Sequence, residues 1–290
     1  MTEFEAPLWS RRRFLGGVTG LVVLGAVSGA CSGDPTGARP ATGTGAAGSV
    51  SPGRVGAGSV DAELISRRYQ GLKPFPAAPT APGAKPMALS PARPGVFSRV
   101  PISDKVVFVT IDDGVEKDPA FIQMVKDFQV PIMVCLADTL IRDDYAYFSR
   151  LYDTGYVSIQ NHTLTHPLDM PHLSAARQLD EIAGQQDKLR AHYGTTPRIF
   201  RPPGGNYDAT TIAAAGQAGL GGVMLWKEAM QIKDMQYQTA GHDLMPGDII
   251  LCHFRGPAQL KGETMVQMMI NLYRHIQAQG FTIADITRYV

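Results

Sequence analysis

Cysteine is scarce in this sequence, with three in 290 residues. Cys31 ends an apolar N-terminal segment, whereas Cys135 and Cys252 lie inside short apolar runs, where small buried thiols are common. So few cysteines predict no disulfide framework. Neither Cys135 nor Cys252 lies in the electropositive surroundings that stabilise a thiolate, which argues against a catalytic cysteine.

The sequence also lacks an excess of positive charge. Its 27 lysines and arginines balance 26 acidic residues, for a net charge of +1 at pH 7. No basic stripe interleaved with aromatic residues occurs in the part expected to fold. Nucleic acids, whose binding depends on neutralising phosphates, are therefore not expected as partners.

Aliphatic residues are sparse from Ser32 to about residue 100, where Gly, Ala, Pro, Ser and Thr dominate. Such a composition cannot bury enough apolar surface to offset the entropy lost on folding. We therefore predict a flexible linker over residues 32–100 and one folded domain over residues 101–290, a usual size for a domain. A short amphipathic stretch, residues 61–69, predicts a helix inside this linker.

Residues 1–31 have the pattern of a signal peptide. The pair Arg12 and Arg13, followed by Phe-Leu, resembles a twin-arginine export signal and precedes an apolar stretch, residues 18–27, that is short for a membrane span. Ser-Gly-Ala before Cys31 resembles the processing site of a bacterial lipoprotein, which we favour over ordinary cleavage at that point or an uncleaved anchor. We expect an exported protein at the cell surface, either membrane-anchored or secreted.

Short apolar or β-branched runs alternate with helical patterns in the rest of the chain. The runs expected to be strands cover residues 106–111, 132–136, 156–159, 198–200, 222–226, 249–253 and 281–283. The helical patterns cover residues 118–128, 143–153, 174–193, 208–218 and 263–279. This alternation predicts parallel β-α units, and therefore an α/β fold built as a distorted (β/α) barrel of seven strands that need not close. In such a barrel, chemistry gathers on the loops after the carboxyl ends of the strands.

Two adjacent carboxylates, Asp112 and Asp113, follow the first predicted strand in the segment Thr-Ile-Asp-Asp-Gly. The pleat and the turn can aim them differently, so that one can bind a metal while the other accepts a proton. Alone, Asp-Asp-Gly is more often a plain turn. The pair therefore needs partners elsewhere in the chain before it indicates a site.

Two histidines, His162 and His166, follow the third predicted strand. Four residues apart, they can face the same way on one helical turn, and imidazole suits Zn²⁺, with Co²⁺ or Ni²⁺ as alternatives. Two histidines with one carboxylate leave coordination positions open for water and substrate, as in a catalytic site.

Further polar segments follow the fourth and sixth predicted strands. In Arg201-Pro-Pro-Gly-Gly the prolines stiffen the loop, while Gly204 and Gly205 allow a ligand to approach the backbone. Arg201 can hold a carboxylate through its planar guanidinium group. The alternatives are a rigid loop without a catalytic role and, for His253 at the end of the sixth strand, a core histidine. Because all the segments fall at strand ends and complement one another, we interpret them as one active site.

The ordered segments Asp-Asp, His-x-x-x-His, Arg-Pro-Pro-x-Gly and Leu-x-His resemble the polysaccharide deacetylases of carbohydrate esterase family 4. The resemblance runs from about Val106 to the C-terminus. It implies a distorted α/β barrel and a metal-dependent hydrolase that removes acetyl groups, mostly from N-acetylglucosamine units.

The resemblance also implies roles for individual residues. The implied metal ligands are Asp113, His162 and His166, with Zn²⁺ as the favoured metal. Asp112 is the implied general base, which takes a proton from the attacking water. His253 is the implied general acid, which protonates the departing amine.

Three further parts of the implied site support these groups. Arg201 would orient Asp112. A backbone N–H at Gly204 or Gly205 would stabilise the oxyanion together with the metal. Leu251 would line the pocket for the acetyl methyl group.

Two departures from the family pattern bear on the substrate. Gly204 stands where members often carry tyrosine, so the groove is expected to be more open. The Asp-Trp segment that supports the acid histidine is not plain, which leaves Asp234 and Glu228 as rival candidates to support His253. Without that tryptophan, one wall of the sugar site is missing.

Together these observations predict an enzyme that deacetylates an N-acetylated polysaccharide, either peptidoglycan or a chitin-like polymer, and that acts as a monomer. Removal of O-acetyl groups and non-catalytic polysaccharide binding are the alternatives. A protein that only binds would not need a base and an acid around a metal, so Asp112 and His253 argue for catalysis.

Overall fold

The structure, a computed structural model, describes residues 60–290. The predicted signal peptide, Cys31 and the first part of the predicted linker lie outside the described residues. Within residues 60–290, no helix is long and apolar enough to cross a membrane.

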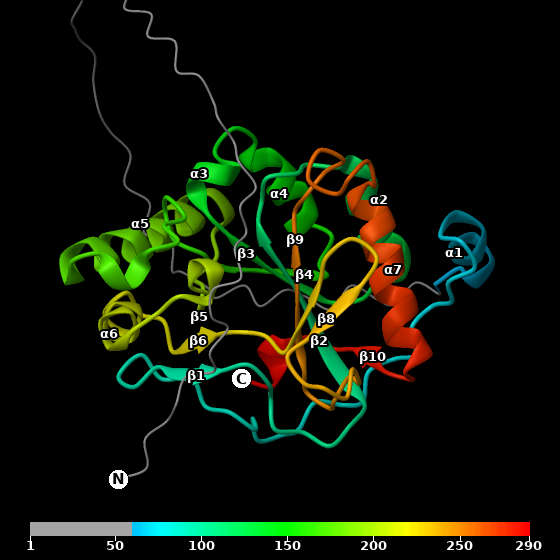
Figure 1. The fold of residues 1–290 in the computed structure, drawn as a ribbon, viewed down its shortest axis with the longest axis horizontal. Coiled ribbons are helices and arrows are strands. Elements are labelled where there is room, and N and C mark those ends of the chain that lie inside the picture. The colour runs from blue at the N-terminus through cyan, green and yellow to red at the C-terminus, as the bar shows by residue number, and fades with distance from the viewer. Residues whose placement is uncertain (1–59) are drawn as a thin grey trace, which may run out of the picture. The chain divides into compact units, whose positions relative to one another are not determined.

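A curled sheet forms the centre of the described part (Figure 1). It contains ten strands in the order β1-β6-β5-β4-β3-β2-β9-β7-β8, with β10 pairing with β2. The bounds are β1 Gly95–Phe97, β2 Val106–Asp113, β3 Ile132–Leu136, β4 Val157–Asn161, β5 Ile199–Phe200, β6 Gly222–Met224, β7 Glu228–Met230, β8 Met235–Tyr237, β9 Ile249–His253 and β10 Thr282–Ile283. Neighbouring strands are parallel except β7 and β8, which form an antiparallel hairpin.

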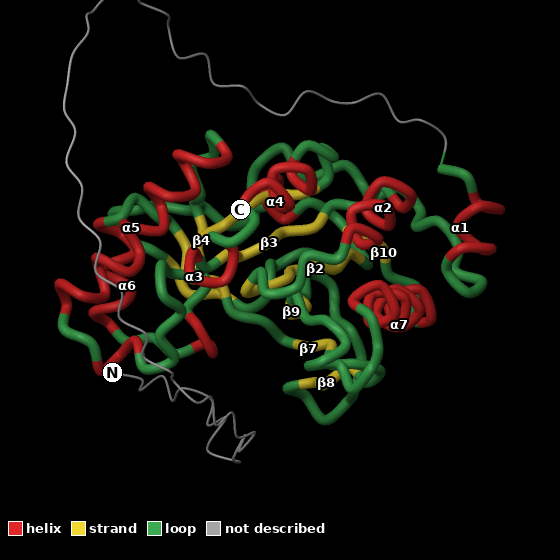
Figure 2. Tube along the Cα trace, turned by 90° about the horizontal axis from the view of Figure 1, so that it is seen from above, coloured by secondary structure: helices red, strands yellow, loops and turns green. Residues whose placement is uncertain are grey.

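Helices flank this sheet, whereas β7 and β8 lie among loops, as Figure 2 shows from above. The α-helices are α1 Ala62–Arg68, α2 Pro119–Phe128, α3 Asp138–Ile141, α4 Tyr145–Tyr152, α5 Ala175–Tyr193, α6 Ala209–Gln217 and α7 Met265–Ala278, and short 3-10 turns cover Met170–His172, Pro203–Gly205 and Ile286–Arg288. Local sequence fixes the ends of α5: the Ser174 side chain accepts a hydrogen bond from the Arg177 N–H, and Gly194 closes the helix in the left-handed conformation.

The prediction of an α/β barrel-like fold is confirmed, and the seven predicted strands appear as β2, β3, β4, β5, β6, β9 and β10. The structure adds β1, β7 and β8, each of three residues and therefore too short to show an alternating pattern. In the part of the chain that the structure describes, no pairing joins β1 to β8, so the curled sheet stays open.

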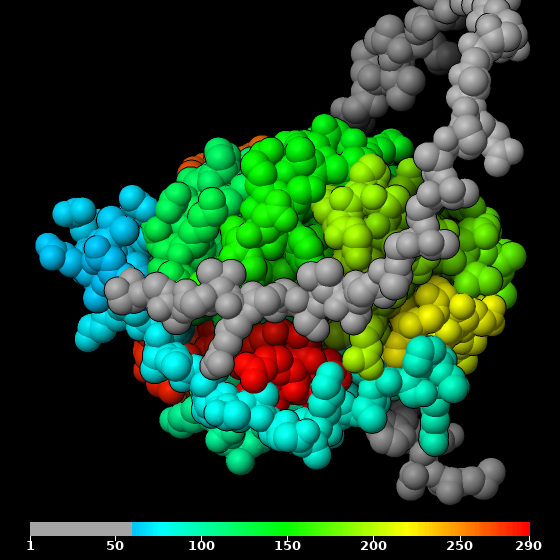
Figure 3. All heavy atoms as spheres, turned by 180° about the vertical axis from the view of Figure 1, so that it is seen from behind, coloured from blue at the N-terminus to red at the C-terminus, as the bar shows by residue number. Residues whose placement is uncertain are grey.

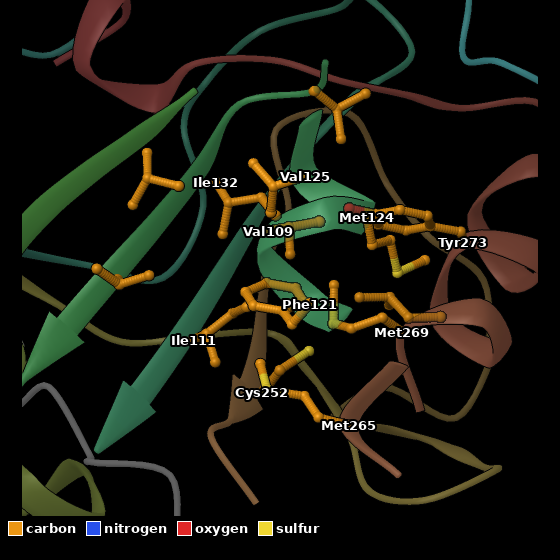
Figure 4. Packing of buried hydrophobic residues seen from close by; sticks show 14 of the residues in the cluster. Val109, Ile111, Phe121, Met124, Val125, Ile132, Cys252, Met265, Met269 and Tyr273 are labelled. Carbon is orange, nitrogen blue, oxygen red and sulfur yellow. The ribbon is translucent and has the colours of Figure 1, made fainter. Parts of the chain in front are cut away.

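Strand β2 shows how the two faces of the sheet differ. It is buried along its whole length, as expected for a parallel strand covered on both sides. Val109 and Ile111 pack outward against helices α2 and α7 (Figure 4). Phe108 points to the inner face, where it meets side chains from β3, β5, β6 and β9. Because side chains alternate along a strand, Thr110 and Asp112 also belong to the inner face.

The segment from residue 60 to residue 100 corrects the predicted linker boundary. Ile65, Tyr69 and Leu72 are buried in the main core, and the carboxylate of Asp127 accepts hydrogen bonds from Arg68 (2.5 Å) and from the Tyr69 hydroxyl (2.7 Å). The predicted helix at 61–69 is therefore present as α1, but it packs on the domain instead of lying in a linker. A few apolar residues at helical spacing are enough to fix a segment that is otherwise rich in Pro and Gly.

The chain after α1 then runs along the rim of the domain to β1. Figure 3 shows this segment beside the C-terminal residues. The Lys85 ammonium group donates to the main-chain oxygen atoms of Thr287 (3.0 Å) and Val290 (2.5 Å), and β1 adds to the sheet beside β6. Residues 60–100 are thus part of the folded domain.

Candidate active site

The end of β2 presents both aspartates. Asp112 is 2% exposed and Asp113 is 9% exposed. Asp113 has a positive φ of 79°, and Gly114 follows with a φ of 103°. A Cβ atom on Gly114 would lie 2.3 Å from the Ile141 side chain, so glycine is required there. Both carboxylates reach the same imidazole, because Nε2 of His162 lies 3.4 Å from Oδ1 of Asp113 and 3.8 Å from Oδ2 of Asp112.

The loop after β4 brings two imidazoles to Asp113. Oδ1 of Asp113 lies 3.1 Å from Nε2 of His166 and 3.4 Å from Nε2 of His162, and the two Nε2 atoms are 3.2 Å apart. The ligand atoms of the three residues all lie within 4.8 Å of one another. The structure therefore brings together the three predicted metal ligands.

A second contact sets the tautomer of His162. Its Nδ1 lies 2.7 Å from the Arg201 carbonyl oxygen, which can only accept, so we assign the proton to Nδ1. The lone pair on Nε2 then faces Asp113 and His166. Two imidazole nitrogens and one carboxylate oxygen fit the donor preferences of Zn²⁺, and a histidine held through its other nitrogen is the usual arrangement around a metal.

The electrostatics of this cluster also suit a cation. Burial alone would raise the pKa of Asp113, but its contacts with His162 and His166 outweigh burial and hold that pKa well below its ordinary value. Burial likewise opposes a charge on His162, yet the carboxylates of Asp112 and Asp113 raise the pKa of His162 above its ordinary value. The cluster thus favours positive charge in spite of its burial.

Arg201 ties the loop after β5 to Asp112. Its side chain is fully buried, and Nη1 donates to Oδ1 of Asp112 (3.0 Å) and to the hydroxyl of Thr110 (2.7 Å). Nε and Nη2 donate to the carbonyl groups of Met224 (3.3 Å) and Leu225 (3.2 Å). Because the guanidinium is fixed on three sides, it holds Asp112 in one orientation.

His253 ends β9, directly beside Asp112 in the parallel register. Burial lowers the pKa of His253 to about 4, against the opposing effect of Asp113, and the charge of Arg255 contributes in the same direction as burial. Among residues 60–290, no side chain forms a hydrogen bond with the His253 ring. The predicted acid therefore reaches the site, but within the described residues no side chain holds its ring by a hydrogen bond.

The loop after Arg201 offers one backbone N–H group that can donate to a ligand. Gly204 and Gly205 both have positive φ angles (63° and 72°). The Gly205 N–H donates to the Pro202 carbonyl group (2.9 Å), which leaves the Gly204 N–H as the candidate donor to an oxyanion. A Cβ atom on Gly205 would lie 3.0 Å from the Trp226 ring, so a side chain there would crowd the ring.

Comparison with known proteins identifies the family. The sequence model described as polysaccharide deacetylase matches residues 99–223. An uncharacterized protein of Streptomyces coelicolor is 36% identical over 200 residues, which cover 68% of this chain and 78% of that protein. The chain belongs to the polysaccharide deacetylase family.

Other members and structures are more distant. A peptidoglycan-N-acetylglucosamine deacetylase of Bacillus cereus is 22% identical over 202 residues, 66% of this chain and 92% of that protein. A family 4 carbohydrate esterase of Streptomyces lividans, in complex with acetate, is 21% identical with a TM-score of 0.52, over 64% of this chain and 95% of that chain. A family 4 pseudoenzyme of Bacillus anthracis is 20% identical with a TM-score of 0.56, over 68% and 69%. These structures show the shared fold, and the pseudoenzyme illustrates that fold alone does not decide activity.

The two carboxylates suggested as supports for His253 lie elsewhere in the structure. Glu228 pairs with Ile250, which points outward, whereas His253 is three residues further along β9 and points inward. Burial, followed by the charge of Asp248, raises the pKa of Glu228 to about 9. Asp234 is exposed in the turn between β7 and β8 and forms no hydrogen bond with His253. The sequence could not show this, because the face that Glu228 occupies depends on its register with β9.

The remaining predicted positions lie close to the site. Leu251 is buried on the inner face between Thr110 and Ala229, two residues before His253. The free thiols of Cys135 and Cys252 are buried, and burial raises the pKa of each. Inert thiols were expected at both positions.

Sequence reasoning missed three polar residues that hold the site together. Thr110 links Arg201 to the Ile250 carbonyl group, Asn161 bonds the Thr163 N–H (3.0 Å), and Glu181 binds Thr165. A polar residue inside an apolar strand was the available signal for Thr110 and Asn161. Glu181 gave no such signal, because a glutamate on a helix is normally exposed.

Proposed function

We propose that this protein is a divalent-metal-dependent hydrolase that removes N-acetyl groups from N-acetylglucosamine units of a cell-envelope polysaccharide. One observation carries the proposal: Asp112, the cluster of Asp113, His162 and His166, and His253 converge at one edge of the sheet. A carboxylate that is not in the cluster, three convergent ligands and a second imidazole are the groups that hydrolysis of an amide requires.

The residues divide the chemistry between them. A divalent cation held by the cluster would polarise the acetyl carbonyl and make water more acidic. Arg201 fixes Oδ1 of Asp112, while Oδ2 lies 3.8 Å from Nε2 of His162 and therefore faces the cluster. Asp112 can then accept the proton of the attacking water.

A backbone N–H and His253 supply the other two roles of the reaction. The Gly204 N–H stabilises negative charge on the carbonyl oxygen as the tetrahedral centre forms. His253 donates a proton to the nitrogen, so that the sugar leaves as an amine. Zn²⁺ is the metal we favour, and Co²⁺ or Ni²⁺ would fit the same ligands.

Acetate release tests the proposal directly. The purified protein is treated with a chelator, reloaded with Zn²⁺, Co²⁺ or Ni²⁺, and assayed on N-acetylglucosamine oligomers and on purified peptidoglycan. We expect metal-dependent release that Asp112→Asn lowers by about 10²–10⁴-fold. Asp234→Asn, which changes an exposed aspartate outside the site, is the matched control and should keep wild-type activity.

Two other outcomes would favour other functions. Release of acetate only from O-acetylated polysaccharide would make the protein an esterase, because the same attack on the carbonyl serves both bonds. Binding of metal and glycan with no release from any substrate would make it a polysaccharide-binding protein. Either result would overturn the N-deacetylase proposal.

We also propose that the protein is exported and held at the cell surface by a lipid on Cys31. The sequence pattern of residues 1–31 supports this proposal. Membrane fractionation with a radiolabelled fatty acid tests it, because Cys31→Ala should abolish labelling and release the protein from the membrane. Unlabelled wild-type protein in the soluble exported fraction would refute lipidation.

A further inference from the structure

We infer that Glu181 is a positioning residue for the metal cluster, which it serves by fixing the backbone next to His166. Glu181 lies on α5, 16 residues after Thr165, and is 2% exposed. Its Oε2 accepts a hydrogen bond from the Thr165 N–H (2.7 Å), and its Oε1 accepts one from the Thr165 hydroxyl (2.7 Å). Both carboxylate oxygens therefore bind the residue that directly precedes a predicted ligand.

The loop that Glu181 holds is strained. Thr163 and His166 have positive φ angles of 71° and 60°, a conformation that side chains other than glycine rarely adopt. Each such residue costs on the order of 1 kcal/mol or more and persists only where its surroundings enforce it. Glu181 also accepts through its backbone carbonyl group from the Leu164 N–H (2.9 Å), so one residue of α5 fixes two successive residues of the loop.

The two histidines differ in how they are held. His162 is held at Nδ1 by the Arg201 carbonyl group, and its side chain is 2% exposed. The side chain of His166 is 22% exposed, and among residues 60–290 its ring contacts only Asp113 and His162 through hydrogen-bonding atoms. His166 thus lacks a ring partner outside the cluster. Its placement must come from its backbone, which is the part of the loop that Glu181 fixes.

The burial of Glu181 supports the same conclusion. A buried carboxylate is costly unless strong hydrogen bonds compensate it. Its only charged partner within the described residues is Arg177, 3.3 Å away on the same helix, and the Arg177 side chain is 60% exposed and therefore weakly stabilising. The compensating bonds are those to Thr165. Folding of α5 does not need a buried glutamate, whereas the loop does need two acceptors at this point.

Zinc affinity, measured without substrate, tests this positioning role. The metal-free full-length protein is titrated with Zn²⁺ against a chromogenic chelator. Glu181→Ala should weaken zinc binding by about 10–100-fold, as the loss of outer-sphere partners does elsewhere. Glu181→Gln keeps one acceptor and should give a smaller loss, while Arg177→Ala keeps both bonds to Thr165 and should bind zinc like the wild type.

A general loss of folding would be a different effect. The thermal unfolding of each metal-free variant is measured first, and where Glu181→Ala does not fold, Glu181→Gln decides the question. Deacetylase activity at saturating Zn²⁺ should largely recover in both variants, because Glu181 does not touch the reacting atoms. Wild-type zinc affinity in a folded Glu181→Ala or, failing that, Glu181→Gln variant would overturn the positioning role.

This inference rests on the metal cluster of the proposed function, but the two can fail separately. If the wild type binds zinc through His166 and releases no acetate, the deacetylase proposal fails. The zinc titration of the variants then still tests the positioning role of Glu181. If acetate is released and the zinc affinity of the Glu181 variants equals that of the wild type, only the positioning role fails. If the wild type binds no zinc, both are refuted.

Discussion

Arg201 and Asp112 form an ion pair of 3.0 Å in which the arginine is fully buried and the aspartate nearly so. The pair joins the loop after β5 to the end of β2, across the inner face of the sheet. Since the carbonyl group of the same arginine holds His162, one residue orients both the candidate base and a candidate metal ligand. Arg201 is therefore central to both the stability and the chemistry of the site.

Loss of this arginine should affect both properties. Arg201→Met leaves Asp112 buried without its hydrogen-bonded arginine, and breaking such a pair costs about 3–5 kcal/mol of the free energy of unfolding. Arg201→Lys should recover only part of this loss, because one ammonium group cannot reach all the acceptors. Chemical denaturation and acetate release measure the two effects. Arg190→Met, at an exposed ion pair on α5, is the control and should change the free energy of unfolding by less than about 0.5 kcal/mol.

A carboxylate on the inner face of β7 should change the pH dependence. Ala229 pairs with Leu251, two residues before His253, and faces the same side of the sheet as His253. His253 must be protonated to act as an acid, and its pKa of about 4 means that the protonated fraction falls as the pH rises above 4. A negative charge nearby raises that pKa, so Ala229→Asp should move the alkaline limb of kcat/KM to higher pH by about one unit.

The matched control for this change is Ala229→Asn, which has the same shape without the charge. The pH profile of kcat/KM for both variants gives the answer. An equal shift in both variants, or no shift in Ala229→Asp, would mean that His253 does not set the alkaline limb.

The N-terminal segment should be essential for stability. A protein of residues 101–290 lacks Ile65, Tyr69 and Leu72, and each buried side chain of this kind contributes about 1.5–3 kcal/mol. It also lacks β1, which covers one edge of the sheet. Compared with residues 60–290, the melting temperature should fall by at least about 10 °C, at roughly 2–4 °C per kcal/mol for a domain of this size.

Circular dichroism during heating measures this difference. Melting of the two proteins within about 3 °C of each other, less than 1–2 kcal/mol at this size, would contradict the assignment of residues 60–100 to the domain. In that case the predicted linker over 32–100 would stand.

Glu228 should make the protein less stable at alkaline pH. Its folded pKa of about 9 lies above the ordinary value of 4.5, so the folded state holds a proton that the unfolded state has lost between these two values. Stability from this group is therefore full below pH 4.5 and declines as the pH rises through 9. Glu228→Gln, which stays neutral, should raise the melting temperature at pH 8.5 more than at pH 5.

The difference between variant and wild type isolates Glu228 from other groups that titrate in this range. Glu63→Gln, on the exposed side of α1, is the control and should give the same small change at both pH values. A gain at pH 8.5 no larger than at pH 5 would show that Glu228 is not held in its neutral form.

Much of this fold was predictable from sequence because the driving pattern is local. Short apolar runs such as 132–136 and 249–252, bounded by polar residues, are typical of strands buried on both faces, and they appear in β3 and β9. Helices between them follow from their spacing and from caps such as Ser174. Since parallel strands end at the same edge, the polar residues that follow them had to gather there.

The sequence by itself determined which residue types reach that edge: two carboxylates, three histidines and an arginine, after the first, third, fourth and sixth predicted strands. Only the tertiary structure decided what each one touches. The register of β7 with β9 placed Glu228 on the outward face, away from the His253 ring, and the packing of α5 brought Glu181 to the loop before His166. The tertiary structure also packs residues 60–100 against the rest of the domain through a few buried side chains. These contacts join residues that are distant in the chain, and local patterns carry no information about such pairings.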